Sequence, residues 1–157
     1  MTGLTLERTA PNVAAVTRRF AASPKAVFEA HMNVDLLKQW LLGPDGWSLT
    51  TCVNDARPGG KIHYVWREDA TGHSFALTGE FVLIDPPHRI IHIERMHLPE
   101  PTPDNRVETR FTADGAGTLM VMTMTVPDAA TLEAMLATGM ADGMEMSYKR
   151  LEALEAA

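Results

Sequence analysis

Apolar side chains recur at steps of three and four residues along the last part of the chain, which is the period of a helix with one buried face. The spacing predicts a single long helix over residues 128–157, and its buried positions are Leu132, Leu136, Gly139, Met140, Gly143, Ser147, Leu151 and Leu154. Each glycine in a helix interior costs roughly 1 kcal/mol relative to alanine, and methionine fills irregular space adaptably. We therefore expect a soft, indented helix face that leaves room for a pocket.

Upstream of this helix, the period of the apolar residues changes to two, as in strands with one buried face. Tyr64 and Trp66, for example, alternate with polar neighbours. Residues 12–20 form an earlier strand, and two short helices follow it, one beginning at Ser23-Pro24 and one at Asp35. Strands that follow one another through short turns favour antiparallel pairing. The sequence thus predicts an α+β fold, in which a curved antiparallel sheet of about six to seven strands wraps around the long C-terminal helix.

The buried faces of the sheet and of the helices supply side chains that would line a pocket between them. The set is mostly apolar, with glycines that leave space, and comprises Trp40, Tyr64, Trp66, Phe75, Leu77, Gly79, Phe81, Met120, Met122, Met124, Met135, Leu136, Gly139, Met140, Gly143 and Met144. The same residues could equally form a solid core, as apolar residues at these spacings usually do. Candidates for polar groups that orient a ligand are Tyr64, Thr109, Ser147 and Arg18, of which Arg18 could instead pair with a carboxylate.

Length and composition restrict the classes of function. A chain of 157 residues, 45% of them hydrophobic, suits one domain over residues 1–157. The net charge of −6 argues against binding to nucleic acid. The chain contains no run of about 18 apolar residues, which a membrane-spanning helix requires. The first residues also lack a signal-peptide pattern, so we expect a cytoplasmic protein. The single cysteine, Cys52, excludes an internal disulfide.

His92 and Glu94 are the best candidates for acid–base catalysis, because they share one face of a predicted strand and a histidine beside a carboxylate can titrate near neutral pH. Tyr64 is a further candidate. The plainer interpretation places His92 and Glu94 on the solvated outer face of the strand. The six histidines show no spacing typical of a metal site, and no phosphate-binding loop occurs, so neither metal nor cofactor is predicted.

Two sets of charged residues have structural interpretations. Asp55 and Arg57 flank a Pro-Gly-Gly turn, where an ion pair would fix the hairpin. The glutamates of the last helix are expected on its solvent side, at Glu133, Glu145, Glu152 and Glu155.

Short motifs of glycine, proline and aromatic residues follow one another in a distinctive order. The most specific is Asp55-x-Arg57-Pro58-Gly59-Gly60. The others are Phe20-Ala21-Ala22-Ser23-Pro24 with Val27-Phe28, Leu36-Leu37 with Trp40 and Gly43-Pro44, Gly79 with Asp85-Pro86-Pro87-x-Arg89, Gly117-Thr118, and Gly143 with Arg150-Leu151. In this order they resemble the activator-of-Hsp90-ATPase-like (AHSA1-like) family of the START/Bet v1-like (SRPBCC) superfamily. The resemblance runs from about Val16 to Leu151, nearly the whole chain.

The resemblance implies a helix-grip fold, whose C-terminal helix closes a curved sheet over a cavity that in most members is thought to hold a small apolar molecule. This chain has Met144 and His31 where members usually carry tryptophan. The first exchange would widen the pocket, and the second would place a titratable group near its mouth. The eukaryotic co-chaperone has a second domain that 157 residues cannot accommodate, so chaperone activation does not follow from the family alone.

Three hypotheses about function result. The favoured one is a carrier or sensor without enzymatic activity, which encloses a small hydrophobic or amphipathic ligand. The first alternative is a small-molecule enzyme of cyclase, dehydratase or hydrolase type that uses His92 with Glu94, or Tyr64, as acid and base. The second alternative is an interaction module, either a homodimer formed through sheet edges or a partner of a chaperone. A histidine or tyrosine that points into the cavity would favour the enzyme, and an exposed apolar patch would favour the module.

Overall fold

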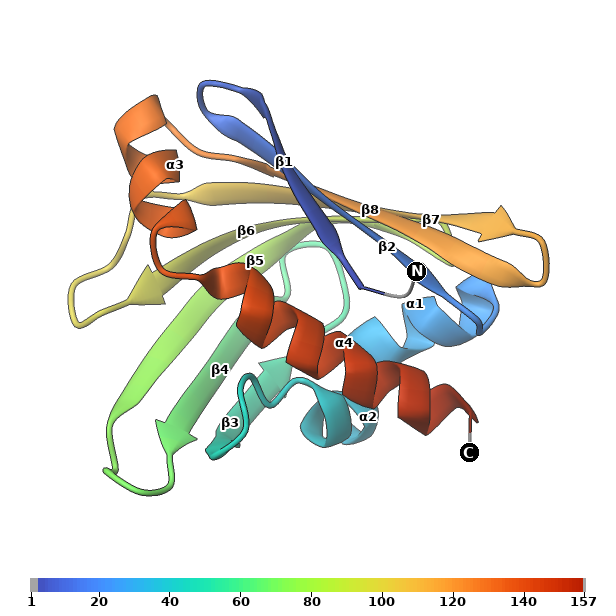
Figure 1. The fold of residues 1–157 in the computed structure, drawn as a ribbon, viewed down its shortest axis with the longest axis horizontal. Coiled ribbons are helices and arrows are strands. Elements are labelled where there is room, and N and C mark those ends of the chain that lie inside the picture. Colours follow the sequence, from blue (N-terminus) through green and yellow to red (C-terminus); the bar gives the residue numbers. More distant parts are fainter. Residues whose placement is uncertain (1–2, 157) are drawn as a thin grey trace.

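A computed structural model describes residues 3–156 and shows one curved antiparallel sheet with helices on its concave side (Figure 1). The eight strands are ordered β1-β2-β8-β7-β6-β5-β4-β3 across the sheet. Their bounds are β1 Thr5–Ala10, β2 Val13–Phe20, β3 Trp47–Asn54, β4 Lys61–Glu68, β5 Ser74–Asp85, β6 Arg89–His97, β7 Asn105–Asp114 and β8 Gly117–Thr125. The predicted α+β fold is therefore confirmed, with one strand more than expected. The additional strand is β1, which is mostly exposed at the sheet edge and so lacks a clear apolar alternation.

Two short helices connect β2 to β3, as the sequence predicts. The first, α1 (Pro24–Met32), begins after Ser23, whose side chain accepts a hydrogen bond from the Ala26 amide. The second, α2 (Val34–Trp40), is capped by Asn33 and not by Asp35 as predicted. The Asn33 side chain accepts hydrogen bonds from two backbone amides of the first turn, which a residue inside the helix could not do.

The single C-terminal helix predicted over residues 128–157 is in fact two helices, α3 (Ala129–Leu136) and α4 (Met140–Ala156). Gly139 separates them with a φ of +72°, a conformation that favours glycine. Gly139 therefore turns the chain and is exposed, so it is not part of a buried helix face. In Figure 1, α3 lies near the β1–β2 hairpin at one end of the sheet, and α4 runs across the concave side toward α1 and α2. Among residues 3–156, no helix is long and apolar enough to cross a membrane.

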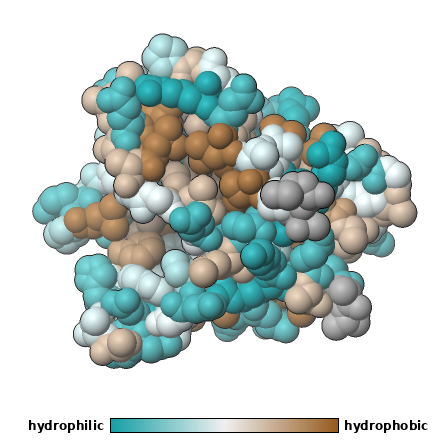
Figure 2. All heavy atoms as spheres, in the orientation of Figure 1, coloured by the Kyte–Doolittle hydropathy of each residue, from teal (hydrophilic) through white to brown (hydrophobic). Residues whose placement is uncertain are grey.

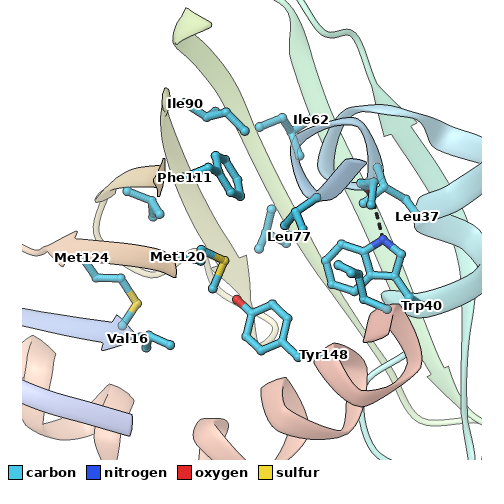
Figure 3. Close-up of a cluster of buried hydrophobic side chains, with 14 of the residues drawn as sticks. Val16, Leu37, Trp40, Ile62, Leu77, Ile90, Phe111, Met120, Met124 and Tyr148 are labelled. Atoms are coloured by element: carbon cyan, nitrogen blue, oxygen red, sulfur yellow. Dashed lines mark hydrogen bonds between the residues drawn. The ribbon is translucent and has the colours of Figure 1, made fainter. Parts of the chain in front are cut away.

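An aromatic cluster joins α4 to α1, α2 and the sheet. Tyr148 of α4 stacks on Trp40 at a ring-centroid distance of 6.0 Å and meets the edge of Phe20 at 5.6 Å. Figure 3 shows Tyr148 reaching from α4 toward Met120 of the sheet. Trp40 is further fixed because its indole Nε1–H donates to the Ala30 carbonyl at 2.9 Å. This end of the concave face is consequently a closed core.

His31 belongs to the same aromatic cluster. Its ring lies 5.0 Å from Trp40 and 5.1 Å from Phe111, and Nδ1–H donates to the Val27 carbonyl at 2.8 Å. Burial lowers the pKa of His31 to about 4, and the neighbouring His92 acts in the same direction. His31 is thus a half-buried histidine of the aromatic cluster whose ring is neutral at pH 7.

Arg18 provides the main electrostatic link between the sheet and α4. Its side chain is 1% exposed, and its Nε and Nη2 donate to the two carboxylate oxygens of Glu145 at 3.0 and 2.9 Å. Glu152 lies 3.8 Å from the same guanidinium. Arg18 therefore pairs with carboxylates, the structural role considered for it. The prediction that Glu145 and Glu152 point to solvent is wrong, because the buried cation requires counter-charges.

The lowered pKa of His31 in this cluster predicts that acid destabilises the protein. The unfolded chain takes up a proton near pH 6.5 while the folded chain resists it down to a pKa of about 4, so stability should fall across this window by up to about 3 kcal/mol. His31→Phe keeps a ring in the cluster and should reduce that fall, as measured by urea denaturation at a series of pH values. His63→Phe, at an exposed position of β4, is the control. An unchanged pH dependence in His31→Phe would contradict the assignment.

Removing the charge of Glu145 should destabilise the fold. The Arg18 hydrogen bonds hold the pKa of Glu145 below its usual value, so the pair stabilises the protein above the ordinary glutamate pKa and is lost as pH falls through the lowered one. We expect Glu145→Gln to reduce the free energy of unfolding at pH 7 by about 2–3 kcal/mol, because Glu152 compensates in part. Glu133→Gln removes an exposed ion pair with Arg8 and should change the free energy of unfolding by less than about 1 kcal/mol. Equal effects of the two substitutions would argue against the buried link.

Candidate functional site

The concave face of the sheet brings together polar residues from neighbouring strands. His92 of β6 lies opposite Phe81 of β5 and Val107 of β7, and Glu94 lies opposite Gly79 and Asn105. Residues directly opposite in an antiparallel pair point to the same side of the sheet. Phe81 and Val107 are 4% and 1% exposed and belong to the core. His92, Glu94 and Asn105 therefore also face inward, and the interpretation of His92 and Glu94 as outer-face residues is wrong.

His92 and Glu94 form a hydrogen-bonded pair on this inner face. The His92 Nε2 and the Glu94 Oε1 are 2.7 Å apart, and the two side chains are 18% and 22% exposed. Side chains that point into the concave interior and still keep this much accessible surface border a space that solvent reaches. Burial is the main cause that raises the pKa of Tyr64 and of Tyr148, and the charge of Glu94 raises both pKa values further.

Several of the predicted apolar side chains are half-buried. Among the predicted ligand-binding residues, the half-buried ones are Phe75, Met122, Met135, Leu136, Met140 and Met144. We give the name inner groove to the region of the concave face beside His92 and Glu94 and the first turns of α4, where Met122, Met140 and Met144 are half-buried. Figure 2 shows apolar side chains gathered between β1 and the α3–α4 segment.

Other predicted ligand-binding residues are core residues in the structure. The buried ones include Trp40, Trp66, Leu77, Phe81, Met120 and Met124. Trp66 donates its indole N–H to the Leu41 carbonyl at 3.0 Å and stacks on Phe75 at 5.2 Å. These residues form the walls that hold the half-buried side chains in place.

Tyr64 has a structural role that does not involve the His92–Glu94 pair. Its hydroxyl donates to Asn54 Oδ1 at 2.6 Å, and the Asn54 amide in turn donates to the Met32 carbonyl at 3.0 Å. Burial raises the pKa of Tyr64, which keeps the hydroxyl protonated. Tyr64 therefore connects β4 to β3 and α1, and the structure brings together only His92 and Glu94 of the three catalytic candidates.

Ser147, another of the polar candidates, has a partner within the protein. The Ser147 hydroxyl accepts a hydrogen bond from the Gly43 amide at 3.0 Å, which fixes α4 to the loop before β3. The Asp55–Arg57 ion pair predicted beside the Pro-Gly-Gly turn is present at 2.8 Å. Thr109 is 5% exposed on the inner face of β7.

Two of the predicted pocket glycines allow close packing and do not create open space. A Cβ on Gly79 would overlap the carbonyl oxygen of Ile93 in β6, and one on Gly143 would lie 3.3 Å from Pro44 Cδ. The absence of a side chain lets β5 approach β6 and lets α4 approach the loop before β3. Their contribution to the site is therefore indirect.

Asn105 lies opposite Glu94 on this inner face and was not among the predicted site residues. It is 6% exposed, and its Oδ1 atom is buried without a hydrogen-bond partner among the described residues. His92 Nδ1 is in the same situation. The signal was present in the sequence, since Asn105 shares the alternation of Val107 and Thr109, but it lies at the first position of its strand.

Two surface depressions lie elsewhere on the molecule. One of about 410 Å³ lies between α1 and the β5–β6 turn, lined by residues that include Phe28, Met32, Ile84 and Pro86. The other, of about 240 Å³, is lined by Ala21, Ala22, Glu152 and Glu155. Neither contains the His92–Glu94 pair. Within residues 3–156, no group of three His, Cys, Asp or Glu side chains is arranged to hold a metal ion.

Comparisons with known proteins agree with this architecture. A crystal structure of a protein from Rhodobacter sphaeroides is 30% identical and superposes with a TM-score of 0.90, covering 98% of each chain. A protein from Mycobacterium smegmatis matches at 22% identity and a TM-score of 0.84 over 96% of each chain. The solution structure of the AHSA1-like protein from Aeromonas hydrophila matches at 18% identity and a TM-score of 0.70, over 89% of this chain and 93% of that one.

A search of the curated proteins found no match. The family model described as activator of Hsp90 ATPase homolog 1-like protein matches residues 21–155. The motifs from Phe20 to Leu151, the sheet wrapped around α4 and this match all agree. The chain belongs to the family of activator of Hsp90 ATPase homolog 1-like proteins.

Proposed function

We propose that this protein binds a small amphipathic molecule in the inner groove, between the concave face of the sheet and α4. The observation that carries the proposal is the accessibility of His92 and Glu94, which remain 18% and 22% exposed although they point into the interior. A pocket for a small molecule is mostly apolar, with a few polar groups that fix the ligand's orientation. The half-buried methionines and the His92–Glu94 pair supply these two elements.

The apolar lining would supply most of the affinity. A ligand that buries about 200 Å² of apolar surface gains about 5 kcal/mol, at about 25 cal/mol per Å². Methionine suits this role because its flexible side chain adapts to different shapes. Met144 and Met140 stand on the first turns of α4, while the aromatic cluster around Tyr148 is fully packed further along the same helix. The ligand therefore has space at one end of α4 and a rigid wall at the other.

The His92–Glu94 pair also supports an enzymatic function as a second candidate. A carboxylate that accepts a hydrogen bond from a histidine orients the ring for proton transfer. Both residues reach solvent from inside the fold, as a general acid–base pair must if it is to meet a substrate. Proton transfer would require the same groove, so the binding experiment below is informative for both candidates.

The interaction-module alternative has less support. Its hallmark would be a contiguous exposed apolar patch. The large apolar side chains that are exposed among residues 3–156 are Val53, Val82, Leu98 and Met146. They belong to β3, β5, the segment after β6, and α4. This scatter gives no single surface for a partner.

A bulky side chain at position 144 should close the groove. Met144→Trp is expected to weaken the binding of the neutral amphipathic fluorophore 6-propionyl-2-dimethylaminonaphthalene by about tenfold, which corresponds to a loss of about 1.4 kcal/mol of apolar burial. Fluorescence titration and calorimetry measure the affinity and the stoichiometry, and mass spectrometry of an organic extract of gently purified protein detects any co-purified ligand.

Met146→Trp is the matched control, because Met146 lies on the same helix and is 39% exposed. It should bind the fluorophore as the unsubstituted protein does, and circular dichroism checks that both variants are folded. If the unsubstituted protein shows no saturable binding, or if both variants bind equally well, the proposal of a groove is refuted.

A further inference from the structure

We propose that the ligand of the inner groove carries a hydroxyl group, as in a phenol or an alcohol, and that this hydroxyl donates a hydrogen bond to His92 Nδ1. The inference rests on the proposed function and adds the chemical class of the ligand. It begins from two buried acceptor atoms on the inner face, His92 Nδ1 and Asn105 Oδ1, which have no hydrogen-bond partner among the described residues.

Glu94 determines which nitrogen of His92 carries the proton. A carboxylate only accepts hydrogen bonds, so the 2.7 Å contact between Glu94 Oε1 and His92 Nε2 places a proton on Nε2. In the neutral ring, the other nitrogen, Nδ1, is then an acceptor. Glu94 is thus a positioning residue, which holds the imidazole in one tautomer and one orientation.

Asn105 supplies the second acceptor. It is paired with Glu94 across β6 and β7, so it is a diagonal neighbour of His92 on the same face of the sheet. Asn105 is 6% exposed, and its Oδ1 is buried without a donor among the described residues. Buried polar groups are nearly always hydrogen-bonded, and an unpaired one is unfavourable. A second hydroxyl of the ligand, or a water molecule that the ligand traps, would satisfy Asn105.

The charges around the pair select a neutral donor. An anionic ligand would meet the Glu94 carboxylate and could offer no proton to Nδ1. A cation would have to be transferred from water into a groove bordered by methionines and by Phe81, which is unfavourable for a full charge. A hydroxyl on an apolar or aromatic body satisfies the acceptors without this penalty. Phe81 lies with its ring centroid 6.2 Å from that of His92, and its edge-on arrangement continues the apolar wall up to the acceptor.

The test compares two probes of similar size, 2-naphthol, which has a hydroxyl, and 2-fluoronaphthalene, which does not. Equilibrium dialysis at pH 8, where an imidazole is ordinarily neutral, gives the dissociation constant of each probe for the full chain. The ratio of the two constants is compared between proteins, because the difference in hydration of the probes then cancels. In His92→Phe the preference for 2-naphthol should fall by about 3- to 10-fold, the usual contribution of one hydrogen bond.

Two further variants keep the result interpretable. His97→Phe alters a histidine of the same strand that bonds Thr78 on the opposite face of the sheet, and it should leave the ratio unchanged within about twofold. His92→Asn places an amide oxygen near the position of Nδ1 and should retain part of the preference, which a purely structural role of His92 would not predict. His92→Asn also replaces His92→Phe in the comparison if His92→Phe fails to fold.

The two probes distinguish a failure of this inference from a failure of the proposed function. If both probes bind and the ratio in His92→Phe, or in His92→Asn where His92→Phe does not fold, is the same as in the unsubstituted protein, the groove exists and recognition of a hydroxyl by His92 is refuted. If neither probe binds saturably, the groove itself is refuted, and the inference falls with it.

Discussion

The buried ion pair between Arg18 and Glu145, together with the stack of Tyr148 on Trp40, determines where α4 lies on the sheet. Arg18 is 1% exposed and points from β2 into the concave side, so the helix that covers it must present a carboxylate at that place. Tyr148 is buried less than one turn further along α4. These contacts anchor the middle and the C-terminal half of the helix. The first turns, which begin after the bend at Gly139, carry the half-buried Met140 and Met144.

The inner groove follows from this uneven covering. One end of the concave face is closed by α1, α2 and the aromatic cluster, in which even His31 is held neutral by burial. The other end has only the α3–α4 segment above it, and there His92 and Glu94 keep accessible surface. Stability and binding are thus separated along one helix. This division resembles the general pattern in which a rigid scaffold positions a less densely packed site.

Hydrogen bonding separates structural polar groups from candidate ligand-binding ones. Arg18, Tyr64 and Ser147 all have partners within the protein, and each links two elements of the fold. His92 Nδ1 and Asn105 Oδ1 have none. The distinction matters in this family because the shared fold, seen at 30% identity in the Rhodobacter sphaeroides protein, identifies the architecture and not the ligand.

The sequence by itself determined the period of each element and therefore the α+β class, the curved antiparallel sheet and the family. Strand β1 was missed because an exposed edge strand needs no apolar face, and the break at Gly139 was missed because a helical period does not reveal a positive φ. The sequence also paired His92 with Glu94, since residues two apart in a strand share a face. The register of β6 against β5 and β7 decided whether His92 and Glu94 lie on the concave or the convex face of the sheet. It also placed Asn105 beside these two residues. Only the tertiary structure decided this, because burial of a polar side chain depends on neighbours distant in the chain.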